Sequence, residues 1–196
     1  VTARLDDIKR LGVNVLWLMP IFPVGVERSA GGLGSPYAVR DYQLVGDEYG
    51  QLADLKQLVE GAHARGMGVV LDWVANHTAW DHPWLSQHPT WYTRDANGTI
   101  LHPPSTNWLD VADLDFTNDS MRLAMIGALR YWTETVGVDG FRCDAADMVP
   151  FSFWKQAIDS LRAGSGSKRL LMLAEGARSD HFAAGFDLNF SWDFYT

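Results

Sequence analysis

Apolar residues follow two alternating spacings along the chain. In one, they recur every three or four positions, which is typical of the buried face of an amphipathic helix. In the other, they form short, nearly continuous runs, which are typical of strands covered on both faces. The first spacing predicts helices over residues 2–11, 52–62, 121–136 and 153–161, the last capped by Ser152, and the second predicts strands over residues 13–19, 67–74, 138–144, 170–175 and 186–191.

Helices and strands that alternate in this way form a parallel sheet with the helices outside it. Polar residues recur where successive strands end: Asp144 and Glu175 lie 31 residues apart, about one strand–helix unit, and Asp72 precedes Asp144 by 72 residues, one unit plus an insertion. Barrel enzymes keep their chemistry on this rim. A doubly wound sheet would carry a glycine-rich turn after its first strand, and residues 20–23 (PIFP) do not resemble one. We therefore predict an α/β fold that is part of a (β/α)8 barrel.

The segment 78–117 follows neither spacing and is rich in proline and tryptophan. Within it, residues 95–98 (DANG) are typical of a hairpin turn. We interpret the segment as a small inserted subdomain, which divides the barrel part of the chain into residues 1–77 and 118–196.

Composition narrows the class of partner. The formal net charge is −8, and nucleic acids and anionic membranes both select a basic face, so neither is expected as the main partner. No apolar run approaches the roughly 20 residues that cross a bilayer. The single cysteine, Cys143, excludes an internal disulfide framework and a multi-cysteine metal cluster. We expect a secreted or periplasmic location rather than a cytoplasmic one.

Two carboxylates at neighbouring strand ends are the candidates for catalysis. Arg142 and Asp144 are two residues apart on a strand and share a face, and an arginine beside a carboxylate keeps it ionised, as a nucleophile requires. Glu175 ends an apolar run, so we expect desolvation to raise the pKa of its carboxyl and suit it to proton donation. This combination is the acid and nucleophile pair of glycoside hydrolysis. The alternative for Arg142 and Asp144 is a plain ion pair.

Two further groups of residues carry chemistry less distinctively. Asp72 and His77 lie five residues apart at the end of a predicted strand and could be metal ligands, which would make a metal-dependent hydrolase. The long loop after the first predicted strand contains residues 35–42 (SPYAVRDY), with two tyrosines. Neither group is specific alone.

Together these segments resemble the α-amylase family of glycoside hydrolases. The matching motifs are residues 72–77 (DWVANH), 140–144 (GFRCD) and 174–175 (AE), with the tyrosine loop before them, in the family's order and spacing. The resemblance implies Asp144 as nucleophile and Glu175 as general acid. It also implies that Tyr37 stacks on the sugar at the cleavage point and that His77 binds it.

The resemblance extends to the surroundings of these residues. Arg142 is expected to hold Asp144 charged and to contribute to substrate binding, with Asp72 and Asp41 in supporting positions. The implied activity is retaining hydrolysis of α-glucosidic bonds in α-glucans such as starch and maltooligosaccharides, with a carbohydrate as partner. A transglycosylase or isomerase of the same family is the nearest alternative, and a non-catalytic binding relative is another.

The chain also departs from the family pattern. Asn76 and Asp113 match positions that hold calcium in many relatives, so the resemblance implies a calcium ion, but Asp147 and Met148 stand where many relatives have Lys and His. The family's first barrel strand and its third catalytic acid have no counterpart in these residues. We therefore expect about strands 2–6 of a barrel, with the insertion after the third strand and the remainder of the barrel in a longer chain.

Overall fold

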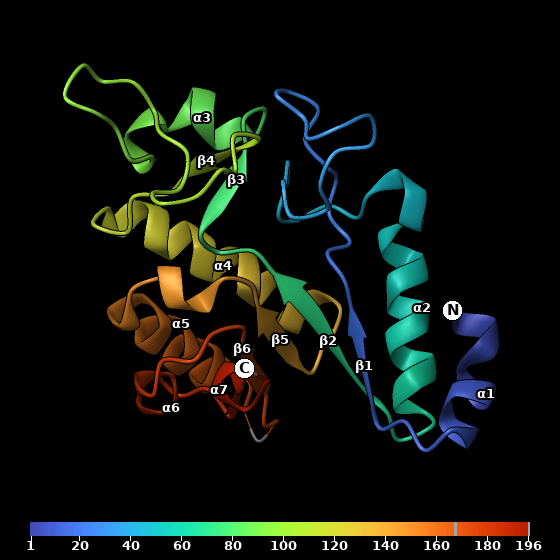
Figure 1. The fold of residues 1–196 in the computed structure, drawn as a ribbon. Coiled ribbons are helices and arrows are strands. Elements are labelled where there is room, and N and C mark those ends of the chain that lie inside the picture. The colour runs from blue at the N-terminus through green and yellow to red at the C-terminus, as the bar shows by residue number, and fades with distance from the viewer. Residues whose placement is uncertain (167, 196) are drawn as a thin grey trace.

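The computed structural model describes residues 1–166 and 168–195; residues 167 and 196 of the predicted barrel part lie outside the described residues. In the described residues, five parallel strands form one sheet in the order β1-β2-β5-β6-β7, with helices between them along the chain (Figure 1). The strands are β1 (Val15–Leu18), β2 (Gly68–Trp73), β5 (Gly140–Cys143), β6 (Leu171–Ala174) and β7 (Leu188–Asn189). Each lies within a strand predicted from the sequence and is shorter than predicted.

The helices occupy the predicted places, with two differences. They are α1 (Leu5–Arg10), preceded by a 3-10 turn, α2 (Leu52–His63), α4 (Asp119–Thr135), α5 (Phe151–Gly164) and the short α6 (Asp180–Ala184) and α7 (Trp192–Tyr195). The predicted Ser152 cap is wrong, because α5 already begins at Phe151 and Pro150 is its N-cap. The Pro150 carbonyl accepts the first helical N–H groups, from Phe153 and Trp154. The sequence predicted neither α6 nor α7, which are only five and four residues long.

The residues 78–117 contribute no strand to the main sheet but share its hydrophobic core through residues such as Trp91 and Leu114. An antiparallel pair, β3 (His77–Ala79) and β4 (Val111–Asp113), joins the two ends of the segment, and α3 (Pro83–Gln87) lies between them. The predicted hairpin turn is present: the Gly98 N–H donates to the Asp95 carbonyl at 3.0 Å, and Arg94 bridges to Ile100. The pairing places His77 beside Asp113, so the segment leaves the barrel one residue earlier than predicted.

Large aromatic side chains fill the space between the sheet and its helices. Phe22, Tyr42, Trp73 and Trp132 form one buried cluster, with ring centroids 5.1 to 6.2 Å apart. The Tyr42 hydroxyl lies 2.8 Å from the Val74 carbonyl oxygen, so this cluster also holds the chain where it leaves β2. Most of the tryptophan that is abundant in the sequence therefore serves packing, which makes a rigid support beneath the ends of the strands.

Strand register determines which side chains share a face. Asp72 of β2 pairs with Arg142 of β5, and Arg142 pairs with Leu173 of β6. Partners in a parallel pair project to the same side, so Asp72 and Arg142 meet at the end of the sheet, with Asp144 two residues further along. Gly140 begins β5 at φ +149, and a Cβ there would stand 1.9 Å from the Leu171 carbonyl oxygen. Only glycine permits this approach of β5 to β6.

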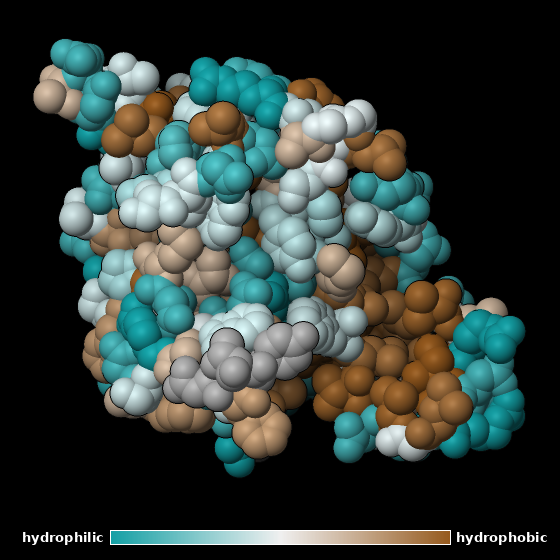
Figure 2. Space-filling model, viewed as in Figure 1, coloured by the Kyte–Doolittle hydropathy of each residue, from teal (hydrophilic) through white to brown (hydrophobic). Residues whose placement is uncertain are grey.

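One side of the molecule has an apolar surface. Figure 2 shows hydrophobic residues gathered over β1, α1 and α2. A cavity of about 220 Å³ lies in this region, lined by residues that include Leu18, Ile21, Leu55 and Leu58. Among the described residues no helix is long and apolar enough to cross a membrane.

Candidate active site

Arg142 is the centre of the group of polar residues at the strand ends. Its guanidinium is buried, and it lies 2.8 Å from Asp72 Oδ1, 2.9 Å from Asp144 Oδ1 and 2.8 Å from Glu175 Oε1. The three carboxylates lie at the ends of three neighbouring strands: Asp72 within the last two residues of β2, Asp144 directly after β5 and Glu175 directly after β6. The structure therefore brings together the four ionisable residues that the sequence selected at these strand ends.

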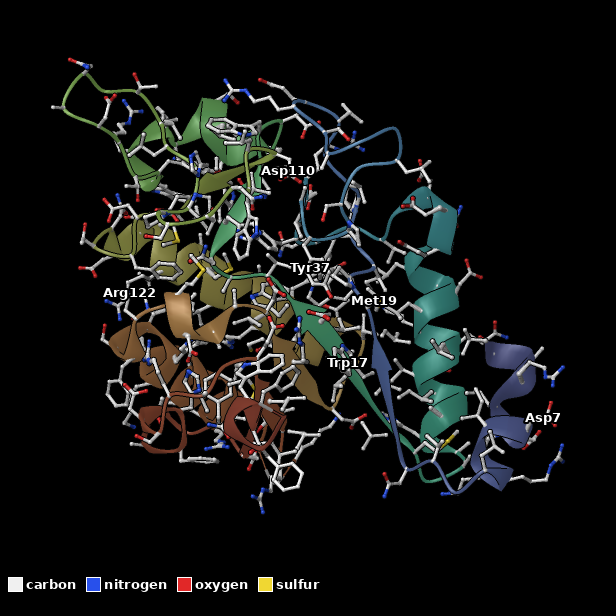
Figure 3. The ribbon with its side chains drawn as sticks, in the orientation of Figure 1. Asp7, Trp17, Met19, Tyr37, Asp110 and Arg122 are labelled. Atoms are coloured by element: carbon white, nitrogen blue, oxygen red, sulfur yellow. The ribbon has the colours of Figure 1, made fainter. Side chains whose placement is uncertain are left out.

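Aromatic rings surround the same guanidinium. The ring centroids of Trp17, Tyr37 and Phe190 lie 5.2, 5.9 and 5.7 Å from its Cζ atom. Trp17 Nε1 donates to Asp72 Oδ2 at 3.1 Å, and the Tyr37 hydroxyl donates to the same oxygen at 3.4 Å. Tyr37 lies beyond the upper ends of β1 and β2, and Asp110 lies above it (Figure 3). Both oxygens of the Asp72 carboxylate thus have partners, and Asp72 holds Arg142 in place.

The charges of this cluster do not balance. One guanidinium faces three carboxylates, so each carboxylate is only partly neutralised. Burial raises the pKa of Asp144 to about 7; Arg142 opposes the shift and the nearby Glu175 carboxylate adds to it. Burial also raises the pKa of Asp72, against Arg142. The pKa of Arg142 is raised because its three carboxylates outweigh its own burial.

The Asp144 side chain is more deeply buried than the Glu175 side chain. The Asp144 side chain is 13 % exposed and the Glu175 side chain 28 %. The prediction of an Asp144 kept fully ionised by Arg142 is wrong, because the burial of its carboxyl outweighs the opposing effect of Arg142 on its pKa. Arg142 is shared among three carboxylates, and the Glu175 carboxylate also accepts the Ala145 N–H at 2.8 Å through Oε2. Ala145 has a left-handed φ of +45, a strained conformation of the kind that concentrates at functional sites.

A cavity of about 270 Å³ opens beside Asp144 and Glu175. It combines carboxylates with aromatic and imidazole rings, and its walls come from the barrel ends, the tyrosine loop and the insertion. Its lining residues are Ser35, Tyr37, His77, Trp108, Asp110, Val111, Asp144, Ala145 and Glu175.

His77 is neutral at pH 7, because burial lowers the pKa of its ring to about 4. The Asn76 side-chain Nδ2 lies 3.2 Å from His77 Nδ1, so Nδ1 acts as the acceptor and Nε2 carries the proton. Tyr37 is also neutral, since burial and the Asp72 carboxylate raise its pKa to about 12. Both side chains can therefore offer the cavity uncharged hydrogen-bonding groups.

Trp108 and Asp110 line this cavity but were not selected from the sequence. The Trp108 side chain is half-exposed, and its ring meets His77 edge to face at 5.5 Å. Trp80 Nε1 donates at 2.9 Å to the carbonyl of Leu109, the residue after Trp108, and so helps to hold the backbone that carries Trp108. A tryptophan within a run of polar residues, 105–110 (STNWLD), was the available signal.

Asp41, predicted as a supporting residue, does not lie in this cluster. Its Oδ1 accepts the Gln43 N–H at 2.8 Å, and its side chain borders another cavity, next to Trp84. Asp41 stabilises a turn of the long loop here. The metal-dependent alternative also finds no support, because Asp72 is engaged by Arg142 and the described residues hold no group of three or more His, Cys, Asp and Glu placed to bind a metal ion.

Asn76 and Asp113, the residues proposed for calcium, line a second cavity of about 480 Å³ together with Asp115. Burial raises the pKa of Asp113, and the neighbouring Asp115 adds to the shift. Two carboxylates and an amide supply oxygen ligands of the kind calcium takes, while Arg122 brings a positive charge to the same wall. Arg122 lies in the first turn of α4, at the end of that helix away from Tyr37 (Figure 3).

Comparison with known proteins agrees with this geometry. The family model for the α-amylase catalytic domain matches residues 1–97. An α-amylase from Lactobacillus plantarum is 38% identical with a TM-score of 0.92, over 99% of this chain and 49% of that one. A noncanonic maltogenic α-amylase from Thermotoga neapolitana is 42% identical with a TM-score of 0.89, over 99% of this chain and 44% of that one.

The chain is also similar to a glycosyl-transferring enzyme. An α-1,4-glucan:maltose-1-phosphate maltosyltransferase from Rhodospirillum rubrum is 33% identical over 82% of this chain and 26% of its own length. The chain thus spans about half the length of the two solved structures and about a quarter of this relative. The prediction of a partial (β/α)8 barrel is confirmed, and the chain belongs to the α-amylase family.

Proposed function

We propose that the protein is a retaining glycoside hydrolase that cleaves α-glucosidic bonds in α-glucans such as starch and maltooligosaccharides. One observation carries the proposal: Asp144 and Glu175 bind the two terminal nitrogens of one guanidinium at the mouth of a cavity lined by rings. Retaining enzymes hold their carboxyl groups about 5–5.5 Å apart, and inverting enzymes about 6.5–9.5 Å apart. Two carboxylates gathered on one guanidinium favour the shorter spacing.

The reaction would proceed in two displacements. Asp144 attacks the anomeric carbon while Glu175 gives its proton to the departing glycosidic oxygen, which leaves a glycosyl–Asp144 ester and an ionised Glu175. Glu175 then takes a proton from water, the water oxygen attacks the anomeric carbon, and Asp144 is released. Each step returns the carboxyl that the next step needs.

The charge of the cluster suits this cycle. The first displacement requires one of the two carboxyls protonated and the other ionised. Burial and the nearby Glu175 carboxylate both raise the pKa of Asp144, so the two carboxyls interact and lose their protons as a pair. Arg142 and Asp72 keep the pair in place while the proton is passed on.

The walls of the cavity support a sugar as the ligand. Tyr37 and Trp108 supply aromatic rings, which pack against the apolar faces of pyranose rings. His77 presents a neutral N–H, and the Asp110 carboxylate is placed to accept from hydroxyl groups. The carbohydrate class of partner follows from this combination.

A transglycosylase is the second candidate, favoured by the maltosyltransferase among the relatives. It would share the first displacement and differ only in the second, where a sugar hydroxyl replaces water. The end products decide between them: free reducing sugars support hydrolysis, and longer or rearranged oligosaccharides support transfer.

The test of retention is proton NMR of the first product released from maltooligosaccharides by the whole natural protein. We expect the α-anomer to form first and the β-anomer to follow by mutarotation. The β-anomer as first product would exclude the double displacement. Glu175→Gln should lower turnover of maltooligosaccharides far more than that of aryl glycosides with activated leaving groups, which need little protonation.

Calcium also belongs to the proposal, as a structural ion at Asn76 and Asp113. When bound there it would connect the chain after β2 to β4 of the insertion, and it would supply no group to the reaction. Its support is the donor chemistry of the second cavity and the raised pKa of Asp113, whose carboxylate a cation would stabilise.

A further inference from the structure

The loops that follow β5 and β6 are bound to each other on both sides of Glu175. After β5, the Ala145 N–H donates to Glu175 Oε2 at 2.8 Å, and the Ala146 N–H donates to the Glu175 carbonyl at 2.9 Å. The side chain and the backbone of Glu175 are thus both held by the segment that carries Asp144. A catalytic acid held in this way has little freedom to turn.

Asp147 continues the same contact one residue further along. Its carboxylate accepts the N–H of Ala177 at 3.0 Å and that of Arg178 at 3.2 Å. In return, Arg178 Nη1 donates to the Asp147 carbonyl at 2.9 Å. The Asp147 carboxylate thus fixes the two residues that follow Gly176 and does not line the catalytic cavity.

His181 packs against Asp147 from behind, without a hydrogen bond to its carboxylate. It is fully buried at the start of α6, and its Nε2 lies 3.3 Å from Asp147 Oδ1. Gly176 sits directly on this pair: a Cβ added there would stand 2.4 Å from Asp147 Oδ1 and 2.8 Å from His181 Cε1. The residue after Glu175 therefore has to be glycine for the loop to rest on Asp147 and His181.

We propose that Asp147, supported by His181, is a positioning residue that aims the Glu175 carboxyl at the glycosidic oxygen. This deepens the proposed function, because it rests on Glu175 acting as the general acid. The chain of contact runs from the Asp147 carboxylate to the Ala177 and Arg178 N–H groups, and from there through Gly176 to Glu175. Asp147 is one of the two residues at which the sequence departs from the family pattern, and this arrangement gives it a role.

The test compares two substrates in variants of the whole natural protein. Asp147→Ala removes both acceptors of the loop, and Asp147→Asn keeps one carbonyl oxygen. A misplacement of about 1 Å can cost on the order of 10²-fold in rate, so we expect Asp147→Ala to lower kcat for maltooligosaccharides by about 10- to 100-fold. For an aryl maltoside with an activated leaving group kcat should fall by less than about 3-fold, because little protonation is needed. KM should change little, and Asp147→Asn should recover part of the loss.

Two controls separate the possible outcomes. Asp159→Asn removes an exposed aspartate of α5 whose carboxylate pairs with Lys155 on the helix surface, and it should leave both rates unchanged. Glu175→Gln sets the size of the difference between the substrates. If Glu175→Gln lowers both rates equally, the general-acid assignment fails.

If Glu175→Gln distinguishes the substrates and Asp147→Ala lowers both rates equally, Asp147 is only a structural residue and the inference is overturned. Should Asp147→Ala fail to fold, the isosteric Asp147→Asn decides, since it must show the same preference for the activated substrate. Gly176→Ala, which presses on Asp147 and His181, should show that preference too.

Discussion

The single positive charge of Arg142 is shared by Asp72, Asp144 and Glu175. It therefore does not offset the burial of Asp144, whose carboxyl has a raised pKa. A carboxyl whose pKa is higher in the folded than in the unfolded protein lowers the free energy of unfolding once it ionises. For Asp144 the window runs from its ordinary 3.8 to about 7. Folding stability contributed by this residue is therefore complete below pH 4 and is lost as pH rises to 7.

Asp144→Asn should remove this loss while abolishing turnover. Removing the nucleophile of a catalytic unit costs about 10⁴-fold or more in kcat. Above pH 7 the variant should be more stable than the wild type by at least about 1 kcal/mol, which raises Tm by about 2–4 °C for a domain of 150–250 residues. The measurement is Tm of both proteins from pH 4 to pH 8. A difference that does not grow with pH would contradict the assigned burial.

Trp108→Ala addresses substrate binding by the insertion. An aromatic contact contributes about 0.5–1.5 kcal/mol, and 1.4 kcal/mol is tenfold in affinity, so KM for maltooligosaccharides should rise by up to about 10-fold. We expect kcat to change little, because Trp108 contributes a ring to the cavity wall, whereas the charged cluster at Arg142 is formed by Asp72, Asp144 and Glu175. Leu109→Ala is the matched control, since Leu109 is exposed beside Trp108 and does not line the cavity. Equal effects of the two variants would remove Trp108 from the binding site.

At the scale of elements, a helix or strand could be predicted from the sequence only where it is long enough to show a regular apolar spacing. The helices and barrel strands have apolar spacings that extend over a whole element, and Asp72, Arg142 and Asp144 follow from period two and from parallel register. The elements β3 and β4 are three residues each, too short to show a period. The exposure of Glu175 depends on the loop after β5, and Trp108 enters the site only because the insertion folds back, which spacing along a chain does not encode.

The pairing of β3 with β4 gives the calcium proposal its test. A cation between Asn76 and Asp113 would bind the folded protein and not the unfolded chain, so Tm should rise with calcium concentration. We expect a chelator to lower Tm of the whole natural protein by several degrees, measured by differential scanning calorimetry. Asp113→Asn should abolish the response to calcium. An identical Tm with calcium and with chelator would exclude a bound calcium ion. The positive charge of Arg122 in that cavity would then explain why no cation binds.

At the scale of the whole molecule, the sheet has two edges in the described residues, β1 and β7. Alternate residues of β1 and its end, Val15, Trp17 and Met19, are exposed although large and apolar. In a closed barrel such side chains would fill the interior. The hydrophobic surface over β1, α1 and α2 continues this exposure (Figure 2).

We therefore expect residues 1–196 expressed alone to aggregate, because unpaired apolar strand edges pair with other chains. A longer polypeptide that supplies further strands to β1 and β7 should be soluble and melt in one cooperative transition. The measurements are size-exclusion chromatography and thermal melting of the two polypeptides side by side, with starch hydrolysis as the functional readout. A soluble, cooperatively melting and starch-hydrolysing 196-residue protein would mean that the five-stranded sheet is sufficient, and that its exposed apolar residues are covered in another way.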